Sequence, residues 1–316
     1  MTKFKDAFGR LCTNRIEELQ GPLLMNPSDA YEPAPSVPLT TISPPHDPDY
    51  AERFLSNNLT VEEARRIGFK GDLIGQVVGR TLAEITGTVL AAELALAHGL
   101  SSTVGGGTHH AYEEFGSGYC VLNDLAIAAN SVLSSGAVET VLVVDCDVHQ
   151  GDGTATFSRA VAGLRTLSVH CQDNFPNRKQ ESTLDVPLPA GATDGEYLEA
   201  LAAALADETE KGGEPGLVIY DAGVDVLEED RLGKLRITPD GMRRRDSLVI
   251  DYYAERGVPV ACVIGGGYNR DLERLAERHC VVHEEAARVW RKREMWKRAG
   301  RTTLAGGRER QADGRK

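Results

Sequence analysis

Four titratable side chains follow a single apolar stretch of the sequence. Residues 141–153 read VLVVDCDVHQGDG, in which a run typical of a buried strand is followed by Asp145, Asp147, His149 and Asp152. Asp147 and His149 are two positions apart, so in extended backbone their side chains lie on the same side of the chain. An imidazole nitrogen and a carboxylate oxygen in this arrangement are typical zinc ligands.

A third ligand is expected at the end of another predicted strand. Asp225 follows the apolar run GLVIYDAG at residues 216–223. A catalytic zinc site uses three protein ligands and leaves one position open for water. We therefore predict a metal site formed by Asp147, His149 and Asp225.

Two adjacent histidines, His109 and His110, follow the glycine run at residues 105–107. A fourth metal ligand would close the site, so Asp145 is better suited to accept the ring N–H of a histidine and fix its tautomer. We predict that Asp145 pairs with one of these histidines and Asp152 with the other. A histidine supported in this way can take a proton from water and pass it to a leaving amine. The alternative is a pair of core histidines bonded to the backbone.

The elements that would position these residues alternate along the chain. Nearly continuous apolar runs predict buried strands, and longer segments of helical period predict helices between them. This order predicts an α/β fold, a single domain with a mostly parallel sheet and helices on both faces. The predicted strands are 101–104, 140–145, 165–170, 216–223 and 258–267, and the clearest helices are 81–99, 123–136, 194–213 and 238–257.

Ligands of open parallel sheets bind beyond the carboxyl ends of the strands. The candidate residues follow four different predicted strands, so we expect them to meet in one crevice. The last of these strands ends in Gly265, Gly266 and Gly267, which are followed by Tyr268. Tyr268 is a further candidate for the site, with a packing role as the alternative.

Composition sets limits on the class of protein. A chain of 316 residues is long enough for one large α/β domain, and no apolar run approaches the roughly 20 residues that span a bilayer. The net charge of −12 argues against general affinity for nucleic acid. The six cysteines form no CxxC pair, and the N-terminus lacks the apolar region of a secretory signal. We expect reduced thiols and a cytoplasmic location, or a nuclear one in a eukaryote.

Charge is concentrated at the C-terminus. Residues 288–316 contain eleven Lys/Arg and three Asp/Glu. We predict a catalytic domain over residues 1–290 and a basic, disordered tail over 291–316.

The candidate residues lie in four blocks of the sequence, GGGTHHAYEEFGSGYCVLND (105–124), VVDCDVHQGDGT (143–154), YDAGVDVLEEDRLGKLRIT (220–238) and VIGGGYNRD (263–271). These blocks resemble the signature blocks of the histone deacetylase family, within the arginase/deacetylase fold. The similarity extends from about residue 38 to about residue 288. Gln150 and the block DVLEEDRLGKL most resemble class IV histone deacetylases and their bacterial relatives.

The resemblance implies a role for each matching residue. Asp147, His149 and Asp225 match the zinc ligands, a set that iron can also use. His110 matches the general base and acid, paired with Asp152, and His109 matches its neighbour, paired with Asp145. Tyr268 matches the tyrosine that polarises the scissile carbonyl and stabilises the oxyanion.

The resemblance also implies a tunnel and a second cation. Gly118, Tyr119, Phe175 and Leu232 match the lining of a narrow tunnel for an acylated lysine, with Tyr119 in place of the more usual phenylalanine. A structural monovalent cation, K⁺, is expected among Asp145, Asp147, His149, Ser168 and Val169.

The expected function is zinc-dependent hydrolysis of the acyl-amide bond of acetyl-lysine, or of longer acyl-lysine, in proteins. A small-molecule amidohydrolase acting on acetylpolyamines or related acylated amines would use the same chemistry. An arginase-like dimetal hydrolase would need a carboxylate where Gly151 stands. A non-enzymatic binding module would be favoured by loss of a zinc ligand or of Tyr268, and both are present.

The N-terminus departs from the family pattern. Relatives begin with a strand that carries a short aromatic motif, whereas this chain begins with KFKDAFGRLCTNRIEEL from residue 3. A missing inner strand would leave backbone groups of a parallel sheet without partners. We therefore expect the first strand to be absent and the stability or solubility of the chain to be low.

Overall fold

The structure, a computed structural model, describes residues 37–69 and 73–293. Within this part of the chain, six parallel strands form one sheet in the order β1-β6-β5-β2-β3-β4. The strands are β1 (Leu100–Ser102), β2 (Val141–Asp145), β3 (Leu164–Cys171), β4 (Leu184–Leu188), β5 (Leu217–Asp221) and β6 (Val260–Val263). The parallel sheet confirms the predicted fold class.

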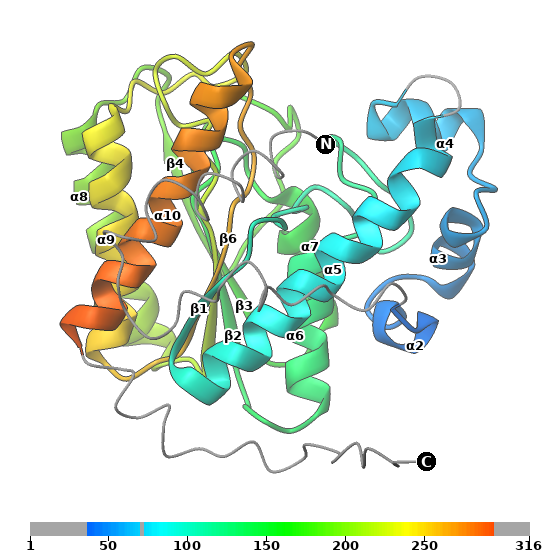
Figure 1. Cartoon of the computed structure of the whole chain (residues 1–316), viewed down its shortest axis with the longest axis horizontal. Coiled ribbons are helices and arrows are strands. Elements are labelled where there is room, and N and C mark those ends of the chain that lie inside the picture. Colours follow the sequence, from blue (N-terminus) through cyan, green and yellow to red (C-terminus); the bar gives the residue numbers. More distant parts are fainter. Residues whose placement is uncertain (1–36, 70–72, 294–316) are drawn as a thin grey trace, which may run out of the picture.

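Helices cover both faces of the sheet, with α8, α9 and α10 on one face and α5, α6 and α7 on the other (Figure 1). The short helices α2, α3 and α4 form a separate group beside α5 (Figure 1). The helices are α2 (Leu39–Ile42), α3 (Pro48–Leu55), α4 (Val61–Ile67), α5 (Leu73–His98), α6 (Asp124–Ser134), α7 (Asp152–Ala160), α8 (Asp194–Gly212), α9 (Pro239–Glu255) and α10 (Leu272–Lys292).

The central strand β2 is buried on both sides because its apolar residues alternate between two cores. Val141 and Val143 pack with α5, α6 and α7, whereas Leu142 and Val144 pack with α8, α9 and α10. Side chains of a strand alternate in this way, so Asp145 continues on the side of Val141 and Val143. The strand therefore directs its last carboxylate toward the face that α5 and α6 cover.

Helix α9 starts and ends as its sequence predicts. The Thr238 hydroxyl accepts a hydrogen bond from the backbone N–H of Gly241 at 3.0 Å, and Pro239 is the first helical residue. Gly257 follows the C-cap residue Arg256 and has a φ of 75°, which a glycine adopts without strain. These caps fix the end of α9 close to the start of β6.

Strand β4 and helices α2, α3, α4, α7 and α10 are not among the elements predicted from the sequence. β4 is an edge strand that pairs only with β3, and it contains Pro187, which an edge strand tolerates because one side needs no partner. The predicted absence of a first strand concerns residues 1–36, which lie outside the described residues. The predicted basic tail, 291–316, lies outside them from residue 294 on, whereas Arg291 and Lys292 form the last turn of α10. No helix in the described part is long and apolar enough to cross a membrane.

Candidate active site

The three predicted metal ligands meet beyond the carboxyl ends of β2 and β5. Donor atoms of Asp147, His149 and Asp225 all lie within 4.8 Å of one another. His149 Nδ1 lies 3.0 Å from Asp147 Oδ1 and 3.3 Å from Asp225 Oδ2. All three residues are buried. The predicted ligands therefore form one compact group.

The charges and hydrogen bonds of this group fit a metal ion. Asp225 Oδ2 is buried and accepts no hydrogen bond from a described residue, while Asp225 Oδ1 accepts the backbone N–H of Val148 at 2.9 Å. Burial and the neighbouring Asp147 raise the pKa of Asp225 to about 6. Burial opposes a charge on His149, but Asp147 and Asp225 raise its pKa to about 10. Two buried carboxylates and one imidazole are donors that zinc prefers, and a bound cation would relieve the repulsion between the two carboxylates.

Backbone next to the ligands holds them in place. The backbone N–H of Gly266 donates to Asp147 Oδ2 at 2.9 Å. A side chain at Gly266 would lie 2.5 Å from Asp147 Oδ2 and 2.6 Å from Asp225 Oδ2. Only a glycine lets the loop after β6 come this close to both carboxylates.

The two histidines each face a carboxylate. His109 Nδ1 lies 2.8 Å from Asp145 Oδ2, and His110 Nδ1 lies 2.6 Å from Asp152 Oδ1. The two rings are adjacent, with centroids 4.0 Å apart. The structure thus brings together both pairs that the sequence suggested, and in each pair Nε2 is the nitrogen that the carboxylate leaves available.

The two histidines differ in charge. Burial opposes a charge on His109, but the carboxylates of Asp145 and Asp147 raise its pKa well above the usual value. Burial and the adjacent charge of His109 lower the pKa of His110 to about 4. At neutral pH His110 is therefore a neutral imidazole that can accept a proton.

A second buried group consists of His109 and two carboxylates on neighbouring strands. Asp221 is the register partner of Asp145 on the neighbouring strand, and donor atoms of His109, Asp145 and Asp221 lie within 4.8 Å of one another. Neither oxygen of Asp221 accepts a hydrogen bond from a described residue, and burial raises its pKa well above the usual range. The sequence interpretation missed Asp221, because the apolar strand before it gives no sign of which strand lies alongside.

Tyr268 lies in the same pocket as the histidines and the metal ligands. Its backbone N–H donates to Asp230 Oδ2 at 2.6 Å, and its carbonyl accepts the backbone N–H of Arg231 at 3.1 Å. Burial and the charge of Asp225 raise the pKa of Tyr268 well above the usual value, so its hydroxyl remains a hydrogen-bond donor.

Two of the four predicted tunnel residues line this pocket, and the other two lie on loops beside it. Gly118 and Tyr119 line it together with His110 and Tyr268. The Phe175 ring contacts the His110 ring edge-on, with centroids 4.8 Å apart, and Asn174 Nδ2 donates to the carbonyl of Leu232 at 2.8 Å. The loops that carry Phe175 and Leu232 are thereby joined.

Two further predicted residues occupy less direct positions. Ser168 is the register partner of Asp145 on β3, and its hydroxyl lies 3.0 Å from His170 Nδ1. The K⁺ site expected around Ser168 stays a prediction. The Gln150 amide donates at 2.8 Å to the carbonyl of Gln180 and at 2.8 Å to the side chain of Asp185. Gln150 therefore anchors the segment before β4.

Two residues that the sequence interpretation missed hold the predicted ones. The Tyr112 hydroxyl donates to Asp152 Oδ2 at 2.8 Å. Asp230 accepts the backbone N–H of Leu232 at 2.8 Å in addition to that of Tyr268. Asp230 belongs to the block DVLEEDRLGKL, which resembles the family, but no sequence pattern indicates its hydrogen bond to the backbone of Tyr268.

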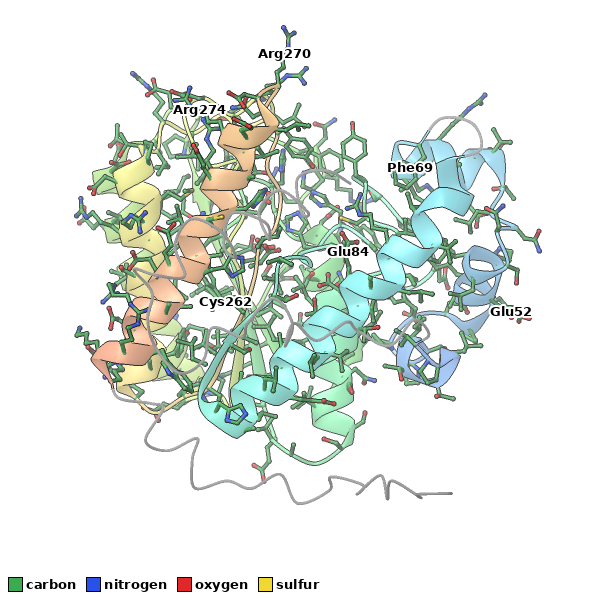
Figure 2. The ribbon with its side chains drawn as sticks, in the orientation of Figure 1. Glu52, Phe69, Glu84, Cys262, Arg270 and Arg274 are labelled. Atoms are coloured by element: carbon green, nitrogen blue, oxygen red, sulfur yellow. The ribbon has the colours of Figure 1, made fainter. Side chains whose placement is uncertain are left out.

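The residues of the site lie at one end of the sheet. Figure 2 shows Arg270 and Arg274 at this end, beyond the loop that follows β6, and Cys262 within the body of the molecule. A parallel α/β sheet that carries an Asp-His-Asp group, a histidine pair and a tyrosine at its carboxyl end has the parts of a metal-dependent hydrolase.

The histone deacetylase domain family matches residues 10–283, so the chain belongs to the histone deacetylase family. An uncharacterized protein of Picosynechococcus sp. is 47% identical over 78% of this chain and 81% of its own length. Histone deacetylase 2 of Arabidopsis thaliana is 33% identical over 61% of this chain, which spans half of that protein. The class IV assignment stays a prediction.

A solved structure gives a similar result for the fold. The crystal structure of an acetylpolyamine aminohydrolase from Burkholderia pseudomallei superposes with a TM-score of 0.67 and 19% identity, covering 92% of this chain and 91% of that one. At this identity the likeness shows the arginase/deacetylase fold. The fold and the family together identify the chain as a hydrolase.

Proposed function

We propose that the chain hydrolyses the acyl-amide bond of acetyl-lysine, or of a longer acyl-lysine, in proteins. The observation that carries this proposal is the convergence in one pocket of a metal-ligand group, the neutral His110 and the Tyr268 hydroxyl. Exposed apolar side chains at the rim fit the methylene stem of a lysine. They belong to Tyr119, Phe175 and Leu232.

Asp147, His149 and Asp225 would hold the metal ion, zinc or alternatively iron. When bound, the ion supplies a Lewis acid that polarises the acyl carbonyl and lowers the pKa of water. We infer a separate structural K⁺ among Asp145, Asp147, His149, Ser168 and Val169.

His110 moves the proton. Its Nδ1 is bonded to Asp152, so Nε2 accepts a proton from the attacking water. The water oxygen bonds to the acyl carbon to give a tetrahedral adduct. The carbon–nitrogen bond of this adduct then breaks as Nε2 returns the proton to the leaving amine. Tyr268 donates a hydrogen bond to the carbonyl oxygen as negative charge develops there.

The same chemistry could act on an acyl group carried by a protein lysine or by a polyamine, and charge near the pocket distinguishes the two. A polyamine substrate would favour carboxylates at the pocket mouth, since its free amines are cationic. Among the described residues that line the pocket, Glu84 and the ligand Asp147 are the acidic ones, and Glu84 pairs with Arg80 at 2.9 Å. This charge balance favours acyl-lysine over acetylpolyamine.

A substrate panel on zinc-loaded and metal-stripped protein tests the proposal. We expect kcat/KM for an acetyl-lysine or longer acyl-lysine peptide to exceed that for N-acetylputrescine by about tenfold or more, the scale of one or two well-made contacts. Metal-stripped protein should cleave none of them. A preference for acetylputrescine would replace the proposal with the small-molecule alternative, and no cleavage of any substrate would refute it.

A further inference from the structure

Asp152, the partner of His110, has a second partner that is no part of the predicted site. His110 Nδ1 lies 2.6 Å from Asp152 Oδ1, and the Tyr112 hydroxyl donates to Asp152 Oδ2 at 2.8 Å. Asp152 is 3% exposed. Both oxygens of this buried carboxylate are therefore engaged, one by each side chain.

Tyr112 is itself held in position. Its ring stacks on Phe115 with centroids 4.6 Å apart and an interplanar angle of 18°, and its backbone N–H donates to the carbonyl of Phe115 at 2.9 Å. The guanidinium of Arg66 lies 4.6 Å from the centroid of the Phe115 ring. Burial and the negative charge of Asp152 raise the pKa of Tyr112. The hydroxyl therefore stays a donor at any working pH.

A carboxylate with a single hydrogen bond is free to rotate about its Cβ–Cγ bond and offer either oxygen. A donor on each oxygen removes this freedom, because rotation would break both bonds at once. The orientation of Asp152 in turn decides where the Nδ1–H of His110 points. The direction of His110 Nε2, on the opposite side of the ring, is fixed with it.

We propose that Tyr112 is a positioning residue for proton transfer: by holding Asp152 Oδ2, it keeps Asp152 Oδ1 on His110 Nδ1 and His110 Nε2 directed at the substrate. This inference rests on the proposed function in one respect, the proton-transfer role of His110. Tyr112 is neither one of the metal ligands nor one of the residues that line the pocket. Its removal should therefore change turnover and leave metal binding intact.

A double-mutant cycle on the zinc-loaded full chain tests the coupling. A general base or acid contributes roughly 10²- to 10⁴-fold, so a residue that only orients one is expected to contribute about five- to tenfold. We expect Tyr112→Phe to lower kcat by that factor with KM within about twofold and zinc content unchanged. In an Asp152→Ala background the same substitution should change kcat by less than about twofold, because the carboxylate that Tyr112 positions is gone.

A matched control separates this role from general loss of a hydrogen bond. Tyr252 lies on α9, outside the active site, and its hydroxyl donates to the carbonyl of Leu205 at 3.1 Å. Tyr252→Phe removes this hydroxyl. It should leave kcat unchanged in both backgrounds, and its melting temperature should match that of Tyr112→Phe.

Proton NMR of the histidine ring N–H groups supplies a readout that needs no substrate. The low-field resonance of His110 Nδ1–H is assigned by its loss in Asp152→Ala, and Tyr112→Phe should move it upfield while Tyr252→Phe does not. If no substrate is cleaved, the proposed function fails and the resonance still decides the role of Tyr112. An unmoved resonance, or an equal loss of kcat in both backgrounds of the cycle, overturns the inference.

Discussion

The floor of the pocket, which holds the metal ligands and the tyrosine hydroxyl, differs from its rim, which carries the exposed apolar side chains. On the floor, Asp147 is 1% exposed and Asp225 0%, and their oxygens are held by backbone N–H groups and by His149. At the rim, Tyr119 is 54% exposed and Leu232 41%. Buried polar groups in fixed positions stabilise developing charge strongly, whereas exposed apolar groups contribute mainly contact area. The floor is therefore suited to chemistry and the rim to substrate selection.

One residue joins the two regions. Asp230 accepts the backbone N–H of Tyr268, whose side chain acts on the floor, and also that of Leu232 at the rim. The loop after β5 and the loop after β6 are thereby tied at the point where the pocket opens. A substitution in either region is expected to keep the other intact as long as this carboxylate remains.

The largest effect is expected on the floor, from Asp225→Asn. Loss of one charged ligand should reduce zinc content and lower kcat by about 10³-fold or more, since a catalytic metal contributes several kcal/mol. Metal analysis and turnover measure both. Asp207→Asn is the matched control, because Asp207 pairs with Lys211 on the exposed side of α8. Normal zinc content in Asp225→Asn would contradict the ligand assignment.

The same variant makes a separate prediction about stability without metal. The folded pKa of Asp225, about 6, lies above the ordinary aspartate value of 3.8, so folding disfavours the charged form. This cost is fully present above pH 6 and disappears as pH falls toward 4. Metal-stripped Asp225→Asn should therefore melt at a temperature equal to or higher than metal-stripped wild type at pH 7.5. A lower melting temperature would show that the buried charge is already compensated.

The next effect concerns Tyr268, which adds a hydrogen bond on the floor without binding the metal. Tyr268→Phe should lower kcat by roughly 10²-fold, the usual cost of losing one oxyanion donor, while zinc content stays normal. Single-turnover kinetics with an acetyl-lysine peptide would measure it. An unchanged rate would remove Tyr268 from the mechanism.

The sequence predicts the floor better than its supports, for a physical reason. Asp147 and His149 are two residues apart on one strand end, so their joint position follows from the geometry of extended backbone. Tyr112 and Asp152 are 40 residues apart, and their contact depends on how the loop before α6 packs against the start of α7. No local pattern carries that information, and the family motif marks Asp152 but not its second partner.

The same contrast holds for the fold. β2 and β5 were predicted because both are buried and nearly continuous in apolar residues. β4 was missed because it is an edge strand with mixed side chains, LDVPL, and its pairing with β3 is what defines it. Asp221 was overlooked for a related reason, since its closeness to Asp145 follows from the order of strands in the sheet.

The smallest effect is expected at the rim, from Tyr119→Phe. Tyr119 has a φ of 67°, and its ring centroid lies 6.2 Å from that of Tyr268. Phenylalanine at this position keeps the ring and removes only the hydroxyl. A more apolar wall should lower KM for an acetyl-lysine peptide by up to about threefold, because burying one methylene group is worth about 0.8 kcal/mol. The kcat value should stay within about twofold, since no proton or developing charge meets this side chain. Steady-state kinetics beside Tyr268→Phe make the comparison direct: a fall in kcat at Tyr119 as large as that at Tyr268 would place this rim residue among the groups that act on the reacting atoms.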